Sequence, residues 1–145
     1  MLSLENASIK VSLTATGKTP LKAYVDSAGF DLYADETVLV LPKSQSWVSI
    51  GVCMQIPIGH CGIIYSRSGL ASKGIIVFNG VVDPGFCGEV KVLLFNLSNE
   101  EYTVEKGTRF AQMIFHKTVN FSFKFTLFDF NSERNNKGFG SSGVW

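Results

Sequence analysis

The chain has 145 residues, which is enough for one domain with its own hydrophobic core. Its 13 basic and 12 acidic residues give a net charge of +1, so it lacks the basic excess typical of general nucleic-acid or membrane-surface binders. These numbers exclude neither an enzyme nor a binding module, and they leave function to local motifs.

The cysteine spacing and the N-terminal sequence indicate in which cellular compartment the protein is expected. Cys53, Cys61 and Cys87 lack Cys-x-x-Cys spacing, which predicts reduced thiols in or near the core rather than a zinc site or a disulfide framework. The chain starts without a basic stretch that leads into an apolar one, and no apolar run approaches membrane-spanning length. We therefore expect an intracellular protein of the cytoplasm or nucleus, with no secretion signal, no membrane partner and no nucleic-acid partner.

Short runs of β-branched and aromatic residues, separated by glycine and proline, dominate the chain. Residues 28–34 alternate small and apolar residues around one acid, Asp31. No segment keeps a 3.6-residue apolar period for three turns, so helix is confined to a turn or two near residues 70–73. The expected fold class is all-β, an antiparallel sandwich or barrel. The predicted strands lie at residues 9–14, 37–41, 46–50, 52–56, 62–65, 89–95, 102–104, 110–116 and 121–130.

Residues 79–91 are the stretch around which we expect the rest of the chain to be organised. Two β-branched arms flank Asp83, Pro84 and Gly85, which predicts a hairpin with its turn in the middle. Phe86 places a ring on the same loop as the Asp83 carboxylate, so both groups could meet one small planar ligand. Alternatively, Asp83 caps the turn and Phe86 covers the edge of the core.

Arginine is scarce, and its positions are informative. Arg67, Arg109 and Arg134 each stand in a short polar or glycine-flanked context, and a planar guanidinium suits bidentate contact with phosphate oxygens. Next to Arg67, Ser68 and Gly69 add a hydroxyl and an unobstructed N–H, the donor types that a phosphate site needs. The same residues also fit ordinary surface arginines and a Ser-Gly turn that begins one turn of helix, so both interpretations stay open.

The composition changes near the C-terminus to a polar, glycine-rich sequence. We therefore divide the chain into a β-domain at residues 1–130 and a flexible tail at residues 131–145. The tail is either a disordered terminus or a lid that brings Arg134, the ring of Phe139 and several N–H donors onto a ligand.

Taken in order, five stretches resemble the five motifs of the trimeric dUTP pyrophosphatases (dUTPases). One short motif is weakly specific, whereas five in register over residues 23–143 are strong support. The resemblance implies a distorted jelly-roll-like β-barrel or sandwich that forms a homotrimer, with active sites shared between subunits and a flexible C-terminal lid. The five stretches are residues 28–34, 67–71, 80–88, 109–114 and 134–143.

The resemblance also implies an enzyme, a dUTP diphosphatase that hydrolyses dUTP to dUMP and pyrophosphate with Mg²⁺. Such an enzyme limits uracil incorporation into DNA and supplies dUMP for thymidylate synthesis. Asp83 matches the family's catalytic carboxylate, which orients and deprotonates the water that attacks the α-phosphorus. Asp31 matches a residue that contacts the metal through water, because the triphosphate itself chelates Mg²⁺.

The same resemblance assigns the contacts with the substrate dUTP. In it, Gln112 reaches the far end of the phosphate chain, Arg134 closes over that chain, and Phe139 stacks on uracil. The backbone at Gly80 and Lys91 is expected to pair with the uracil edge. The substrate-binding residues are thus Arg67, Ser68, Gly69, Gly80, Val81, Val82, Phe86, Lys91, Gln112, Arg134, Phe139, Gly140 and Ser141.

The chain departs from the family pattern in two places. Phe86 stands where the family usually has tyrosine, so the ring on the deoxyribose is kept and a phenol hydrogen bond is lost. Residues 135–137 replace a more glycine-rich stretch of the lid. Two alternatives remain: a non-catalytic nucleotide-binding or regulatory module on the same fold, and a dCTP deaminase. Hydrolysis of dUTP is favoured because the chain retains Asp83, Ser68, Gln112, Arg134 and Phe139.

Overall fold

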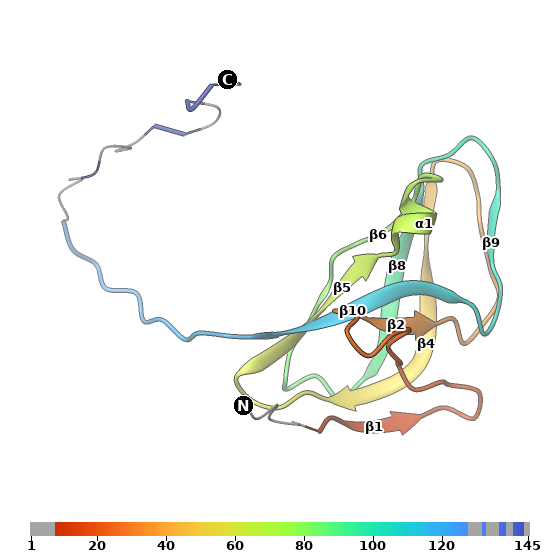
Figure 1. Ribbon diagram of the computed structural model, residues 1–145, viewed down its shortest axis with the longest axis horizontal. Helices are drawn as coiled ribbons and strands as arrows, with labels where there is room; N and C mark the ends of the chain where they lie inside the picture. Colours follow the sequence, from red (N-terminus) through yellow and green to blue (C-terminus); the bar gives the residue numbers. More distant parts are fainter. Residues whose placement is uncertain (1–7, 128–131, 133–136, 139–140, 144–145) are drawn as a thin grey trace.

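The computed structural model describes residues 8–127, 132, 137–138 and 141–143 of the chain. Two four-stranded sheets face each other, with strand orders β1-β4-β8-β6 and β2-β10-β5-β7, and β3 pairs with β9 in a separate ribbon (Figure 1). This arrangement confirms the all-β, sandwich-like fold. The elements are β1 (Lys10–Leu13), β2 (Phe30–Tyr33), β3 (Val38–Val40), β4 (Ser44–Gln55), β5 (His60–Ser66), α1 (Ser68–Ala71), β6 (Ile75–Val77), β7 (Val81–Val82), β8 (Glu89–Asn96), β9 (Tyr102–Val104) and β10 (Arg109–Lys117).

The core follows the period of two that strands impose on their side chains. In β8, Val90, Val92 and Leu94 are buried, whereas Leu93 and Phe95 are only half-buried on the opposite face. Burial of one such aliphatic side chain contributes roughly 1.5–3 kcal/mol, so the sandwich supplies a rigid frame for the loops at its ends. In the described part of the chain, no helix is long and apolar enough to cross a membrane.

The two strands predicted at residues 46–50 and 52–56 form one bent strand, β4. Gly51, which the sequence suggested as a strand boundary, lies inside β4 with φ of 65°. The pairing of β4 with β8 shifts register between Ser49 and Cys53, as expected for a bulge. The bend lets the first part of β4 pair with β8 and the last part with β1.

The hairpin predicted at residues 79–91 is wrong. Its first arm, β7, pairs with β5 in one sheet, and its second arm, β8, pairs with β4 and β6 in the other sheet. The turn itself does form, because the Phe86 N–H donates to the Asp83 carbonyl at 3.1 Å. Turn chemistry is local, whereas the partner of each arm depends on distant strands, so the stretch is a crossover between the sheets. We call residues 83–88 the crossover loop.

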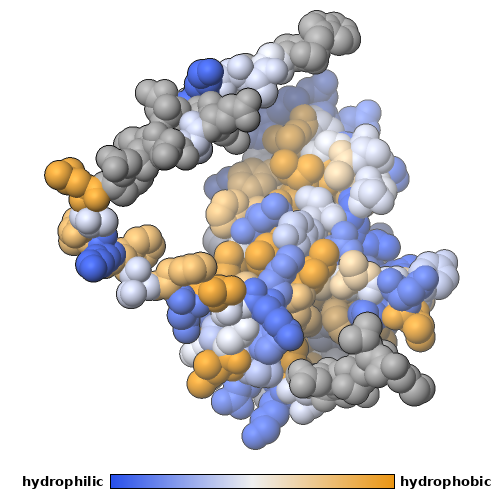
Figure 2. Space-filling view, turned by 60° about the vertical axis from the view of Figure 1, so that its left-hand side comes forward, coloured by the Kyte–Doolittle hydropathy of each residue, from blue (hydrophilic) through white to orange (hydrophobic). Residues whose placement is uncertain are grey.

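The strand predicted at residues 121–130 is also wrong over the part that the structure describes. Residues 118–127 form no strand and run away from the sheets after β10 (Figure 1). The apolar period of two is real, but no strand among the described residues pairs with it, so Phe121 is 79% and Phe123 is 96% exposed. Apolar side chains along this projecting segment are visible in Figure 2. We call residues 118–127 the arm.

The prediction of three core or near-core thiols holds for two of them. Cys61 is buried and Cys53 is partly buried, but Cys87 is exposed because it lies on the crossover loop rather than in a strand. The single predicted turn of helix is confirmed as α1, which begins slightly earlier than expected, at Ser68. The structure adds a short strand, β6, that the sequence did not predict.

Candidate active site

A polar cavity of about 430 Å³ gathers residues from three separate stretches of the sequence. Asp31 on β2 and Gln112 on β10 are directly paired across the second sheet. On the other side of β10, Gln112 pairs with Tyr65 of β5, the strand that leads into α1. We call this opening the arginine cavity. Its lining residues are Ala23, Tyr24, Ser27, Gly29, Asp31, Arg67, Ser68, Gly69, Leu70, Lys73 and Gln112.

The Asp31 carboxylate organises the charges of the arginine cavity. It is only 7% exposed, and each of its oxygens meets one arginine at 3.2 Å. Arg67 Nε forms an ion pair with Oδ1, and Arg109 Nη1 donates a hydrogen bond to Oδ2. Arg67 Nη1 also donates to the Arg109 carbonyl at 3.0 Å. Since a guanidinium carries five N–H donors, Arg67 keeps donors for a ligand while its orientation is fixed.

Gln112 is held against a glycine at the floor of the same cavity. Its Nε2 donates to the Ser66 carbonyl at 2.9 Å. A Cβ atom on Gly29 would collide with Gln112 Oε1, so glycine is needed for the amide to lie there. By contrast, a Cβ on Gly69 would have no atom within 4 Å, which leaves that backbone open to a ligand.

A second, more apolar cavity of about 300 Å³ lies beside the crossover loop. Five of the residues predicted to bind substrate line it: Gly80, Val81, Val82, Phe86 and Lys91. We call it the Phe86 cavity. Its lining residues are Trp47, Ile64, Phe78, Gly80, Val81, Val82, Phe86, Val90, Lys91 and Leu93.

The backbone around the Phe86 cavity is already hydrogen-bonded within the chain. The Gly80 N–H donates to the Phe78 carbonyl at 2.8 Å, and the Gly80 carbonyl accepts from Ile64 N–H at 3.0 Å. Only the second lone pair of the Gly80 carbonyl is left for a ligand, so a base contact there has to be made as an acceptor. The Phe86 ring folds over Gly88, where an added Cβ would lie 2.9 Å from Phe86 Cζ.

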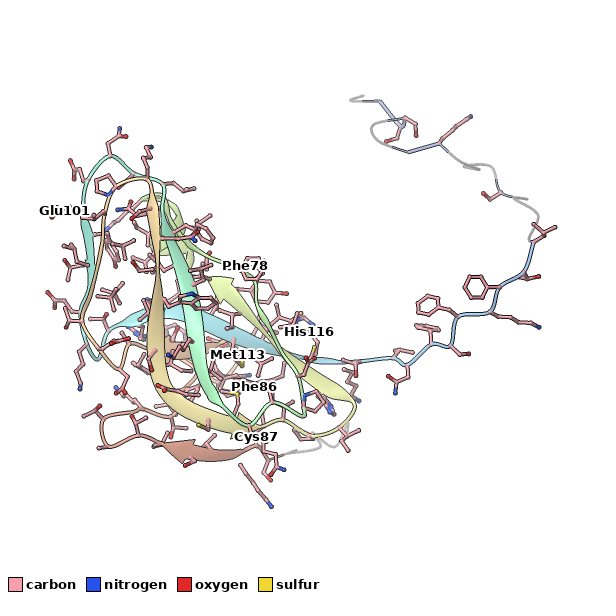
Figure 3. All side chains as sticks on the ribbon, turned by 180° about the vertical axis from the view of Figure 1, so that it is seen from behind. Phe78, Phe86, Cys87, Glu101, Met113 and His116 are labelled. Carbon is pink, nitrogen blue, oxygen red and sulfur yellow. The ribbon has the colours of Figure 1, made fainter. Side chains whose placement is uncertain are left out.

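The predicted catalytic residue, Asp83, lies next to the Phe86 cavity in the sequence but does not line it. It follows Val82 directly and is exposed on the turn. Figure 3 shows Phe86 and Cys87 of the crossover loop at the end of the sandwich opposite Glu101. The loop therefore presents the carboxylate beside the cavity rather than inside it.

One chain does not bring all predicted site residues together. The arginine cavity and the Phe86 cavity share no lining residue. Arg134, Phe139 and Gly140 lie outside the described residues. Ser141 is described, and its N–H donates to the Gly138 carbonyl at 3.1 Å. The base end and the phosphate end of the predicted site thus lie in separate cavities of the same subunit.

Sequence reasoning missed several lining residues. Trp47 and Phe78 reach the Phe86 cavity because the pairing of β4, β8 and β6 places both beside Leu93. Tyr24 and Lys73 reach the arginine cavity from loops. Only strand register could have revealed the first pair, whereas the small-residue pattern around Gly29 was a usable signal for the tight contact with Gln112.

The dUTPase family model matches residues 15–143. The deoxyuridine 5'-triphosphate nucleotidohydrolase of Candida albicans is 41% identical over 140 residues, covering 94% of this chain and 88% of its own length. The protein of that name from Saccharomyces cerevisiae is 37% identical and covers 99% of both chains. The solved Staphylococcus bacteriophage 80alpha dUTPase with dUPNHPP is 28% identical, covers 94% of this chain and 99% of its own, and has a TM-score of 0.89.

Proposed function

Because the chain belongs to the dUTPase family, we propose that it is a dUTP diphosphatase that cleaves dUTP to dUMP and pyrophosphate. The observation that carries the proposal is the arginine cavity, where β2, the start of α1 and β10 bring Asp31, Arg67 and Gln112 around one polar opening. The cell would use this reaction to limit uracil in DNA and to supply dUMP for thymidylate synthesis.

In the proposed reaction, Asp83 orients a water molecule and accepts its proton as the water attacks the α-phosphorus. The new P–O bond forms there while the bridging bond to the β-phosphate breaks, so pyrophosphate leaves. Support comes from the exposed position of Asp83 on the turn beside the Phe86 cavity. A positioned general base typically contributes about 10²–10⁴-fold to the rate.

We place uracil and deoxyribose in the Phe86 cavity. The Phe86 ring, held over Gly88, would pack on the sugar and leave no room for a 2′-hydroxyl. The Gly80 carbonyl and the backbone at Lys91 would meet the uracil edge. Cytosine would present the wrong hydrogen-bonding groups to them, and a buried polar group left unpaired costs roughly 1–3 kcal/mol.

We place the triphosphate against the arginine cavity of a different subunit. Arg67, Ser68 and Gly69 would donate to the phosphate oxygens, and Gln112 would reach the far end of the chain. Arg134 and Phe139 of the tail would close over phosphate and base, which makes residues 131–145 a lid on the β-domain at residues 1–130. These tail roles rest on the motif resemblance alone.

The residues present fit a magnesium ion that is bound by the substrate. Both Asp31 oxygens are paired with arginines, and in the part of the chain that the structure describes no three His, Cys, Asp or Glu side chains gather into a metal site. A carboxylate oxygen has two lone-pair sites, so Asp31 can still accept from a metal-bound water. Mg²⁺ on the triphosphate would neutralise charge at the phosphorus under attack.

We further propose a homotrimer, since the base and phosphate cavities of one subunit are separate. Two apolar surfaces of the chain support self-association. Trp47 and Phe78, each 59% exposed, flank Leu93 on the outer face of the first sheet. On the arm, Phe121, Phe123 and other apolar residues alternate with polar ones and stay exposed. Contiguous exposed apolar surface marks interaction sites.

A nucleotide assay tests the proposed activity. The trimer should release pyrophosphate from dUTP much faster than from dCTP, dTTP or UTP. Ammonia release from dCTP would instead identify a dCTP deaminase, and binding of dUTP without product would identify a non-catalytic module. Either of those two outcomes would overturn the proposal.

Mixing inactive variants tests whether sites are shared. Chains with Asp83→Asn and chains truncated before Arg134 should each be inactive, but mixed trimers should recover activity. With random mixing of equal amounts, about a quarter of the sites would have an intact loop from one subunit and an intact tail from another. Confirmed mixed trimers without any recovery would mean that each site lies within one chain.

A further inference from the structure

Two of the three thiols line one small surface cavity, which shares no lining residue with either cavity of the proposed active site. Cys53 on β4 and Cys87 on the crossover loop line a cavity of about 290 Å³, together with Lys10, Ser12 and Gln55. Cys53 is partly buried and Cys87 is exposed, so reagents in solution can reach the pair.

The shared cavity lies at the end of the pairing between β4 and β8. Cys53 is paired with Glu89 across β4 and β8, and Cys87 precedes Glu89 by two residues. A disulfide needs a Cα separation of about 4.4–6.8 Å, so the bond forms once a shift of Cys87 toward Cys53 reaches that separation.

The chain allows this shift on the side of Cys87. Cys87 lies just before β8, outside the sheet ladder, and its Sγ meets only a weak acceptor, the Gly85 carbonyl at 3.7 Å. Gly85 and Gly88 flank the thiol and give the loop backbone freedom. Cys53, by contrast, is fixed between β1 and β8 and would serve as the anchor.

We propose that Cys53 and Cys87 form an oxidisable dithiol, which a peroxide converts into a disulfide that restrains the crossover loop. One thiolate attacks a peroxide oxygen, the O–O bond breaks, and a sulfenic acid and hydroxide form. The second thiolate attacks that sulfur and displaces hydroxide, so the S–S bond forms and the peroxide is reduced to two waters. Both thiols together lose two electrons and two protons.

The effect on catalysis rests on the proposed function, because the same loop carries Asp83 and Phe86. A Cys87 that is pulled toward β4 changes the backbone at Gly88, over which the Phe86 ring folds. The ring and the carboxylate would both leave their reactive positions. Oxidation is therefore inhibitory, and reduction of the disulfide restores the loop.

The experiment treats the full-length enzyme with hydrogen peroxide and follows two independent readouts. Peptide mass spectrometry without reductant should find Cys53 joined to Cys87. The rate of dUTP hydrolysis should fall at least about fivefold and return to within about twofold after dithiothreitol, as expected for a loop that gates the reaction. Cys53→Ser and Cys87→Ser should each keep the activity of the reduced enzyme and lose the reversible inhibition.

The third thiol supplies the matched control. Cys61→Ala removes the buried thiol of β5 and should leave both the cross-linked peptide and the reversible inhibition in place. Absence of the Cys53–Cys87 peptide, reversible inhibition that persists in Cys53→Ser, or a full cross-link without change in rate would each overturn the proposal. Inactivity of the reduced enzyme toward dUTP would instead refute the proposed function, while the cross-link would still be measurable.

Discussion

The arginine cavity and the Phe86 cavity are held in different ways. Charges fix the first, because the nearly buried Asp31 carboxylate pairs with Arg67 and Arg109 across two strands and a helix start. Apolar contacts and a loop shape the second cavity. Its Phe86 side chain packs over Gly88, and the residue is still 44% exposed. The phosphate end of the proposed site is thus preorganised in a single subunit, whereas the base end depends on loop conformation.

This difference suits the two parts of a nucleotide. Phosphate needs fixed donors, since any reorganisation during the reaction would cost catalytic stabilisation. A base and a sugar need shape and a few backbone contacts, which a loop can supply. Substitutions in the arginine cavity should therefore alter binding of the phosphate chain, and substitutions in the crossover loop should alter chemistry and selectivity.

The largest effect is expected on the crossover loop, at Asp83. Asp83→Asn keeps the shape of the side chain but cannot accept the proton from water, so kcat should fall by about 10²–10⁴-fold. Binding of a non-hydrolysable dUTP analogue should stay near the wild-type level, as calorimetry would show. Glu101→Gln neutralises an exposed carboxylate at the far end of the sandwich and should leave kcat unchanged (Figure 3). A variant at Asp83 that keeps more than about a tenth of wild-type turnover would exclude Asp83 as the base.

The next largest effect is expected on KM for dUTP, from a substitution in the arginine cavity at Gly29. Gly29→Ala forces a Cβ into the Gln112 amide, which must leave the Ser66 carbonyl. Loss of one hydrogen bond to a charged ligand is worth about 1.5–3 kcal/mol, so KM for dUTP should rise about tenfold or more. Gln112→Ala should give a similar rise in steady-state kinetics, and the double variant should add little to it because both changes act on one contact. An additive double variant would show that the two residues act separately.

A smaller effect on selectivity tests the Phe86 cavity. Gly88→Ala places a Cβ 2.9 Å from the Phe86 ring, which has to move away. We expect the ratio of kcat/KM for UTP to that for dUTP to rise several-fold, since a displaced ring excludes the 2′-hydroxyl less well. Gly85→Ala on the same loop meets nothing within 4 Å and is the matched control. Equal ratios in both variants would argue that ring position does not set sugar selectivity.

The smallest effect is expected outside both cavities, at Asp35, and it concerns the pH dependence of the unfolding free energy. Its pKa is lowered chiefly by the hydrogen bond from Thr16 at 2.6 Å, with further contributions from Thr14 and Lys106. A lowered pKa stabilises the fold above the unfolded value of 3.8, and this stability is lost as pH falls through the folded value. The unfolding free energy should therefore decline less steeply with falling pH below about pH 4 in Thr16→Val. Urea denaturation at several pH values measures this slope. In an Asp35→Asn background the same substitution should no longer change that slope.

Much of the architecture and of the site could be predicted from the sequence. Alternating apolar residues predicted most strands, and turn residues predicted both α1 and the turn at Asp83, because side-chain period and turn chemistry act over a few residues. The motifs also identified Asp31, Arg67 and Gln112 before any geometry showed that they line one cavity. Resemblance over residues 23–143 further gave the family, which the comparisons confirm.

Only the tertiary structure decided which segments meet. Local sequence could not tell that β7 joins the opposite sheet from β8, or that Gly51 bends a strand instead of ending it. It also could not tell that the arm pairs with no strand among the described residues. Local sequence also could not tell that Trp47 lies beside the proposed base site, or that Cys53 and Cys87 line one cavity. The physical reason is that strand pairing and burial depend on residues far apart in sequence, so the same alternating pattern serves an inner strand, an edge or an exposed arm.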